Sequence, residues 1–216
     1  MKIKQQVSIK RFLIQEFEEE KALSIFEKQE SFLQNAIDKT KGKSRNQLKT
    51  LTQTILPRIA LYQALKDQQL KEQVVFDIMR KYMLDVVAAS KHASTSKMEK
   101  FPGFFYIYRN VFLKIMRTTD LQESTQEKGK DYYNITITRC LWHEACVEHG
   151  CPELCPLFCD VDDVTYGGLK KIGFTRTKTL GYGGDCCDFH FYKKIIKEFV
   201  KWIVTVAIGN HIYIRK

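Results

Sequence analysis

The 216-residue sequence predicts an α+β fold, in which an N-terminal helical region packs on a small antiparallel sheet with short helices. Early in the chain, apolar side chains recur at three- and four-residue steps with charged residues between them, which indicates amphipathic helices. Later, short stretches alternate apolar and polar residues and are rich in β-branched side chains, which indicates strands. We expect a helical region at 1–130, a cysteine-rich α+β region at 131–194 and a C-terminal extension at 195–216, together forming one domain.

The helical region contains four segments with helical periodicity, which are residues 7–37, 48–68, 72–90 and 104–120. A polar break at 41–47 separates the first two. Within the second segment, Pro57 predicts a kink or a junction between two helices, because its ring cannot continue a helix interior. Residues 92–103 are expected to form a loop that ends at Pro102 and Gly103. The last segment is strongly aromatic and is expected to be a buried helix.

The cysteine-rich region predicts short strands separated by short helices. The expected strands are residues 134–140, 173–180 and 186–194. A Gly-rich turn joins the last two, which predicts an antiparallel hairpin. Between the first two, LWHEACVEHG predicts a short helix closed by Gly150, and Pro152 fits the first turn of the next helix.

Chain length and the apolar stretches indicate the cellular compartment in which the protein is expected. A chain of this size can build a core without disulfides, so the cysteines are not expected to be staples. The first residues show no apolar run typical of a secretory signal. The most apolar stretch, residues 199–208, has about half of the ~20 residues that a membrane-spanning helix needs, and it contains Lys201. We therefore expect a cytoplasmic protein, in which thiols stay free, bind metal or react.

The net charge of +10 is unevenly distributed. Along the predicted helices basic residues alternate with acidic ones, as on a solvated helix face. The cysteine-rich segment 131–190 is acidic, with 5 Lys and Arg against 9 Asp and Glu. A nucleic-acid reader would cluster its basic residues with aromatic side chains, so no nucleic-acid partner is expected.

All seven cysteines lie between residues 140 and 187, and their spacing bears on metal binding. Cys151, Cys155 and Cys159 are four residues apart and would share one face of a helix. Together with the adjacent Cys186 and Cys187, they match no zinc or iron–sulfur pattern well. No metal site or cofactor is therefore predicted, although metal binding stays an alternative.

Some thiols are expected to pack as small hydrophobic groups, and we assign Cys146 and Cys155 to packing or surface positions. A nucleophilic thiol needs a lowered pKa. Cys140 lies where a strand gives way to a helix, whose N-terminus stabilises an anion. Cys159 precedes the acidic run 160–163, which raises a thiol's pKa. Electrostatics therefore favour Cys140, but the spacing alone does not decide between the two.

Several short motifs of this region together resemble the L-2-amino-thiazoline-4-carboxylic acid hydrolase family, over roughly residues 50–192. The matching positions are Arg139-Cys140, Gly150, Pro152-Glu153-Leu154, Phe158-Cys159, Asp162, Arg176, Thr179-Leu180, Gly183-Gly184 and Cys187-Asp188-Phe189, together with the helical stretch 55–65. The ending GGDCCDFHF also resembles the close of vinyl-4-reductase-like ligand-binding domains, which are α+β modules.

The resemblance implies a hydrolase that opens a small cyclic amidine or thiazoline such as L-2-amino-thiazoline-4-carboxylate, with a small molecule as its partner. Such chemistry needs a nucleophile at the amidine carbon, a proton donor and a cation for the carboxylate, for which Arg is best suited. The expected catalytic residues are Cys140 or Cys159 as the nucleophile, with Asp162, Cys187 and Asp188. The expected substrate-binding residues are Arg176, Arg139 and Glu153. His143 and His149 are expected to be exposed.

Two other classes of protein fit the same residues. A non-catalytic module could hold a small molecule or a metal in the same place without turnover. A redox-sensing protein would form a disulfide among Cys140, Cys151 and Cys159 on mild oxidation. The oligomeric state is not predicted.

Overall fold

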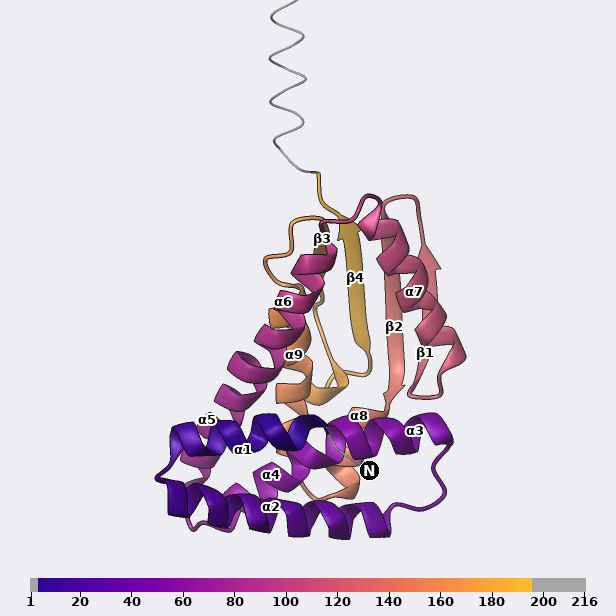
Figure 1. The fold of residues 1–216 in the computed structure, drawn as a ribbon. Helices are drawn as coiled ribbons and strands as arrows, with labels where there is room; N and C mark the ends of the chain where they lie inside the picture. Colours follow the sequence, from indigo (N-terminus) through magenta and orange to yellow (C-terminus); the bar gives the residue numbers. More distant parts are fainter. Residues whose placement is uncertain (1–3, 196–216) are drawn as a thin grey trace, which may run out of the picture.

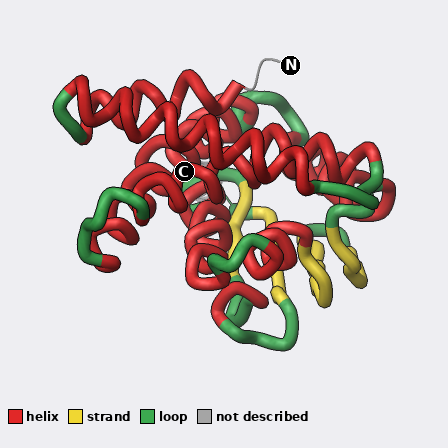
Figure 2. Tube along the Cα trace, turned by 90° about the horizontal axis from the view of Figure 1, so that it is seen from below, coloured by secondary structure: helices red, strands yellow, loops and turns green. Residues whose placement is uncertain are grey.

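A computed structural model describes residues 4–195 and confirms the predicted α+β fold, in which a helical base lies across one end of a four-stranded sheet (Figure 1). The apolar stretch 199–208 and all of the extension beyond Ile195 lie outside the described residues. The base comprises α1 (Lys4–Glu16), α2 (Glu19–Lys39), α3 (Arg45–Thr50) and α4 (Leu56–Lys66). Seen from below, the long helices of the base run crosswise to the strands (Figure 2).

The helical base follows the predicted breaks. The predicted helix 7–37 is divided at residues 17–18 into α1 and α2. After the polar break, Ser44 and Gln47 form a reciprocal capping box that starts α3. The junction expected at Pro57 is confirmed, because a π-helical segment, Leu51–Ile55, gives way there to α4. Pro57 lies in the first turn of α4 and follows directly on the π-helical segment, as is typical of an irregularity at a proline inside a continuous helix.

The prediction of a loop at 92–103 is wrong over most of this range. The chain runs from α5 (Glu72–Lys81) through a π-helical segment, Tyr82–Ala88, into α6 (Ala89–Met98) without a break. The Ser94 and Thr95 hydroxyls donate to the carbonyls four residues earlier, at Ser90 and Lys91. These side chains are thus satisfied within the helix instead of ending it. Only residues 99–103 form a turn.

The predicted helix at 104–120 is confirmed as α7 (Phe104–Thr118), but only one face of it is buried. Its buried residues are Phe104, Phe105, Leu113 and Met116. Its opposite face carries exposed apolar side chains, Ile107, Val111 and Ile115. The helix covers the sheet beside β1 and β2 (Figure 1).

The sheet has the order β1-β2-β4-β3, and all neighbouring strands are antiparallel. Its strands are β1 (Gln122–Lys128), β2 (Tyr132–Cys140), β3 (Ile172–Thr175) and β4 (Cys187–Lys193). Strand β1, which reads QESTQEK, was not predicted and lies within the segment expected to be helical. The predicted hairpin of β3 and β4 is confirmed. However, β3 ends at Thr175, and the chain continues as a loop to a 3₁₀ turn at Leu180–Tyr182.

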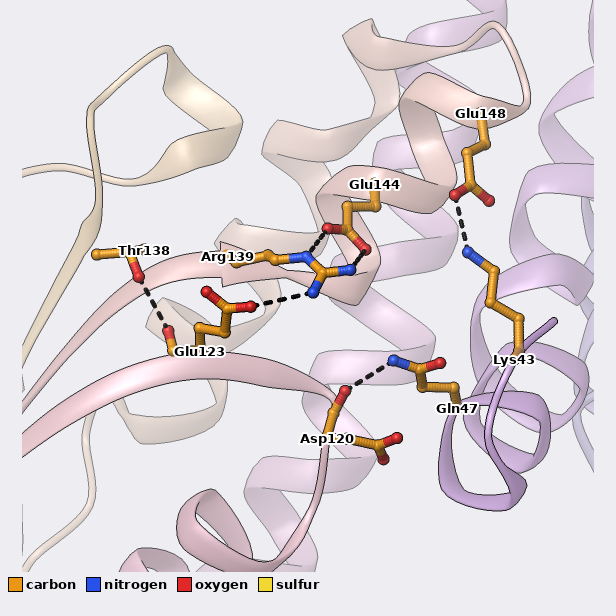
Figure 3. Close-up of polar contacts among 8 residues, drawn as sticks. All are labelled: Lys43, Gln47, Asp120, Glu123, Thr138, Arg139, Glu144 and Glu148. Atoms are coloured by element: carbon orange, nitrogen blue, oxygen red, sulfur yellow. Dashed lines mark hydrogen bonds and ion pairs between the residues drawn. The ribbon is translucent and has the colours of Figure 1, made fainter.

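Two helices connect β2 to β3. The first, α8 (Leu141–Glu148), is followed by Gly150 with φ of 66°, as predicted for a helix end. A 3₁₀ turn, Pro152–Leu154, then leads into α9 (Cys155–Tyr166), which lies between α6 and the sheet (Figure 1). Ion pairing of Lys43 with Glu148, at 2.8 Å, ties α8 to the helical base (Figure 3).

Residues 4–195 form two apolar cores. One lies among the helices of the base and includes residues of α8 and α9. The other lies between α7 and the sheet, where the rings of Tyr133 and Phe191 stack with centroids 4.7 Å apart. No helix in the described part of the chain is long and apolar enough to cross a membrane.

Candidate active site

A cavity of about 240 Å³ lies where the two cores meet. Helices α4, α6, α7, α8 and α9 contribute to its wall, together with strands β2 and β4 and the turn at Leu180–Gly181. Most of the lining is apolar and includes Phe112, Met116, Ile137, Trp142, Phe158 and Phe189. Four of the eight predicted site residues line this cavity, namely Cys140, Cys159, Asp162 and Cys187.

Cys140 is the last residue of β2 and the residue that precedes α8. Burial raises the pKa of its thiol to about 12, although the backbone N–H groups of His143 and Trp142 act in the opposite direction. The N-terminus of α8 therefore lowers the pKa of the Cys140 thiol, as predicted, but desolvation raises this pKa by a larger amount. The pKa of Cys159 is raised further than that of Cys140, so the order expected from sequence for these two thiols holds, and the thiol whose pKa is lowered is Cys155.

Three thiols from α8 and α9 form a contiguous cluster, which we call the thiol cluster: Cys146, Cys155 and Cys159. Hydrogen bonds from Cys146 and Cys159 to the Cys155 sulfur lower the pKa of Cys155. The pKa of Cys159 is raised, first by its hydrogen bond to Cys155 and then by burial. The negative charge of an ionised cluster therefore resides on Cys155. The assignment of Cys155 to packing overlooked this, because the contacts join residues from two helices.

Gly181 closes the cavity wall against the thiol cluster. A Cβ atom at this position would lie 2.7 Å from the Cys159 sulfur and 3.1 Å from the Cys155 sulfur. Any larger residue would therefore displace both sulfur atoms. The absence of a side chain at residue 181 allows the Leu180–Tyr182 turn to approach α9 this closely.

Cys187 faces the cavity from β4, on the same side as the buried Phe189 and Phe191, as the alternation predicts. Its sulfur accepts a hydrogen bond from the backbone N–H of Leu180 at 3.3 Å. Burial raises the pKa of its thiol.

Asp162 lines the cavity from α9, and no hydrogen-bond donor within residues 4–195 is assigned to its carboxylate. Desolvation raises its pKa from the ordinary 3.8 to about 6, against the attraction of Lys91 and Arg176. At neutral pH the cavity thus contains a carboxylate that is ionised yet poorly compensated, which can bind a cation.

Arg139 and Glu153 lie outside the cavity. Figure 3 shows the Arg139 guanidinium between Glu123 and Glu144, and it forms ion pairs with both from a side chain that is 53% exposed. Glu153 accepts hydrogen bonds from the Tyr62 hydroxyl at 2.9 Å and the Lys66 ammonium at 3.3 Å. The charged groups of both residues are thus engaged in contacts outside the cavity.

Asp188 points to the opposite face of β4 from Cys187. Its carboxylate accepts hydrogen bonds from the backbone N–H groups of Thr177 and Lys178, both at 2.9 Å, and from the Thr177 hydroxyl. It thereby fixes the loop that leads to Gly181. Arg176 starts this loop with a side chain that is 9% exposed and paired with Asp163. Arg176 is not part of the cavity lining, but its charge acts on Asp162.

Three basic residues of the cavity were not predicted as site residues: Arg58, Lys91 and His143. Arg58 is 4% exposed and comes from α4, and the exposed Lys91 comes from α6. The signal for Arg58 was available, since it is the one charged residue in the apolar stretch ILPRIALYQAL. His143, expected to be exposed, is half-buried on α8 and its charge lowers the pKa of Cys155.

The described residues contain no group of three or more His, Cys, Asp or Glu side chains placed to hold a metal ion. All seven cysteines are free thiols.

This architecture defines an α+β protein with a small cavity that is lined by thiols and buried charges between a helical base and a sheet. The chain belongs to the L-2-amino-thiazoline-4-carboxylic acid hydrolase family, whose model matches residues 49–191. The resemblance found in the sequence is thereby confirmed.

Comparison with curated proteins gives no match. Among solved structures, the crystal structure of the Fe(II) unliganded H-NOX protein from K. algicida is similar at 10% identity, with 87% of this chain and 95% of that chain covered and a TM-score of 0.29. A mutant of the same protein covers 78% of this chain and 89% of its own, at 10% identity and a TM-score of 0.27.

Proposed function

We propose that this protein is a hydrolase that opens a small cyclic amidine, such as L-2-amino-thiazoline-4-carboxylate, with a cavity thiol as the nucleophile. The observation that carries the proposal is the convergence of Cys140, Cys159, Cys187 and Asp162 on one cavity. Family membership supplies the class of reaction. The cavity volume of about 240 Å³ suits a ligand smaller than those of typical drug-sized sites.

The electrophile in this reaction is the carbon of the protonated amidine. A thiolate adds to this carbon and forms a neutral tetrahedral adduct. The ring carbon–sulfur bond then breaks, and its electron pair goes to the departing sulfur, which takes a proton. Water adds to the carbon that is still bound to the enzyme, and the new adduct loses a proton and expels the enzyme thiolate. One water is consumed, and a carbamoyl-cysteine and one proton are released.

The contacts in the cavity support specific roles. Asp162 binds the amidinium, since it is a half-buried carboxylate in the cavity wall whose pKa is raised by desolvation. Cys159 delivers the sulfur, because it is the partly exposed member of the thiol cluster and hydrogen-bonds to Cys155. Cys155 accepts the Cys159 proton as the bond to carbon forms. His143, on the same wall, protonates the departing sulfur. Cys140 is the second candidate for the nucleophile.

The test is mass spectrometry of the purified protein incubated with L-2-amino-thiazoline-4-carboxylate. The wild type and the Cys140→Ala, Cys159→Ala and Cys187→Ala variants are compared, with circular dichroism as a check of folding. We expect the substrate to gain the mass of one water in the wild type and to stay unchanged in folded Cys159→Ala. Loss of turnover in Cys140→Ala alone would assign the nucleophile to Cys140 instead. Stoichiometric binding without turnover would contradict the hydrolase and indicate a binding module.

A further inference from the structure

Arg58 is a buried cation with few partners. Its side chain lies on α4 among apolar neighbours, is 4% exposed and lines the cavity. Among residues 4–195 it makes one hydrogen bond, from Nε to the Gln5 side-chain oxygen at 3.1 Å. The guanidinium also lies 5.6 Å from the centroid of the Phe158 ring. A guanidinium has five N–H donors, so most of its hydrogen-bonding capacity is free for a ligand.

The charges around the cavity favour an anion at this end. Burial lowers the pKa of Arg58 to about 10, so the side chain stays charged at neutral pH. Lys91 also lines the cavity; burial lowers its pKa, the Asp162 carboxylate opposes this shift, and the charge of Arg58 adds to it. Asp162 is the single carboxylate among the described lining residues. An anion would therefore relieve both the desolvation of Arg58 and its repulsion with Lys91.

The other two arginines considered for this role lie outside the cavity lining, although the buried Nη1 of Arg176 has no hydrogen-bond partner within residues 4–195. Arg176 forms an ion pair with Asp163, and Arg139 forms ion pairs with Glu123 and Glu144. A carboxylate inside the cavity therefore has Arg58 as its available guanidinium partner.

We propose that Arg58 binds the carboxylate of the ligand, so that the cavity selects small amidines that carry a carboxylate. The inference rests on the proposed function for the identity of the amidine. Arg58 and Asp162 then form two poles, one for the carboxylate and one for the amidinium, and hold the ring beside the thiols between them. Arg is suited to this task because its planar fork pairs with both carboxylate oxygens.

The experiment compares binding of L-2-amino-thiazoline-4-carboxylate with binding of 2-amino-2-thiazoline, which has the same ring without the carboxylate. Calorimetry is done on a variant that the turnover assay has shown to be inactive, or on the wild type if it shows no turnover. We expect the carboxylate to strengthen binding roughly 10- to 100-fold. Arg58→Gln should remove this preference, and Arg58→Lys should retain part of it.

Arg176→Gln is the matched control, since it removes a buried guanidinium outside the cavity lining and should leave the preference intact. Thermal unfolding of each variant shows whether it is folded. A preference that survives in folded Arg58→Gln, or one that is lost in Arg176→Gln, overturns the inference, as does failure of both compounds to bind at millimolar concentration. Turnover without an Arg58-dependent preference refutes only this inference. An Arg58-dependent preference without turnover refutes only the hydrolase.

Discussion

The two sides of the cavity contribute different chemistry. The helical part supplies the cations, with Arg58 on α4 and Lys91 on α6, whereas the cysteine-rich part supplies the thiols, His143 and Asp162. The reactive groups come from one short stretch of chain, and the cations come from helices far earlier in the sequence. A cluster of reactive residues in a sequence therefore indicates where the reactive part of a site lies. The residues that select the ligand can be isolated ones elsewhere in the chain.

The two sides also differ in how their groups are held. Arg58 belongs to a helix that is buried along nearly all of its length, so its position is fixed by packing. The thiol cluster instead depends on close approach of α8, α9 and the turn at Leu180–Tyr182. A change in that turn should disturb the reactive side and leave the cation side in place.

Gly181→Ala is expected to have the most unequal effects on the two sides, with a large loss of turnover and little change in carboxylate-dependent binding. The new Cβ atom would lie 2.7 Å from the Cys159 sulfur, and the Cys155 sulfur and backbone are within 3.2 Å, so the thiols must move. We expect turnover to fall by about 100-fold or more, because displacement of a reacting atom by about 1 Å has effects of that size. Carboxylate-dependent binding should change little. Turnover and calorimetry on the same preparation measure the two effects, and unchanged turnover would show that the thiol cluster is not the reactive group.

Asp162→Asn should affect stability and function in opposite directions. The carboxyl pKa is raised from 3.8 to about 6 in the folded state, so the folded protein holds more protons than the unfolded chain between these pH values. Stability of the wild type therefore falls as pH rises through this window and stays low above it. The rise in pKa corresponds to about 3 kcal/mol at about 1.36 kcal/mol per pH unit. The Asn variant should be more stable than the wild type at pH 7 by up to this amount.

Urea unfolding at pH 7 and at pH 4 measures this difference, which should shrink at the lower pH. The same variant should bind the amidine more weakly, and wild-type binding should weaken as pH falls through about 6. Equal stability of the two proteins at pH 7 would mean that a hydrogen-bond donor compensates the carboxylate.

Much of this arrangement could be predicted from the sequence, and the failures have physical causes. Helix periods, the Pro57 junction and the alternation on β4 depend on local chemistry, and each was predicted correctly. The strand β1 was missed because its half-buried face carries polar side chains, Gln122, Ser124 and Gln126, so the sequence shows no apolar alternation. For Asp188 and Cys155 the sequence could not show the contacts that surround them, for a different reason. Their roles depend on the loop at 176–178 and on α8, which only the tertiary structure brings beside them.

A moderate effect is expected for Asp188→Ala. Desolvation raises the pKa of this carboxyl, but hydrogen bonds from Thr177 and Lys178 outweigh it and lower the pKa. This contribution to stability is present at neutral pH and is lost as pH falls through the lowered pKa. We expect a loss of about 1–2 kcal/mol in the free energy of unfolding at pH 7. Turnover should fall less than in Gly181→Ala, because the loop is loosened and not blocked; a larger fall in turnover with unchanged stability would instead support direct catalysis by Asp188.

The smallest effect is expected for Arg139→Ala, although Arg139 lies directly beside Cys140 in the sequence. Its guanidinium is on the surface, and its side chain is 53% exposed. Exposed ion pairs contribute little to stability and are screened by salt, so Tm should drop slightly at low salt and match the wild type at high salt. Neither turnover nor the preference for a carboxylate should change, since the ion pairs with Glu123 and Glu144 hold this arginine outside the cavity. Loss of that preference would show that the surface arginine reaches the ligand. In that case the cysteine-rich part would supply both the reactive groups and a cation that binds the ligand. The two sides of the cavity would then not differ in the chemistry that they contribute.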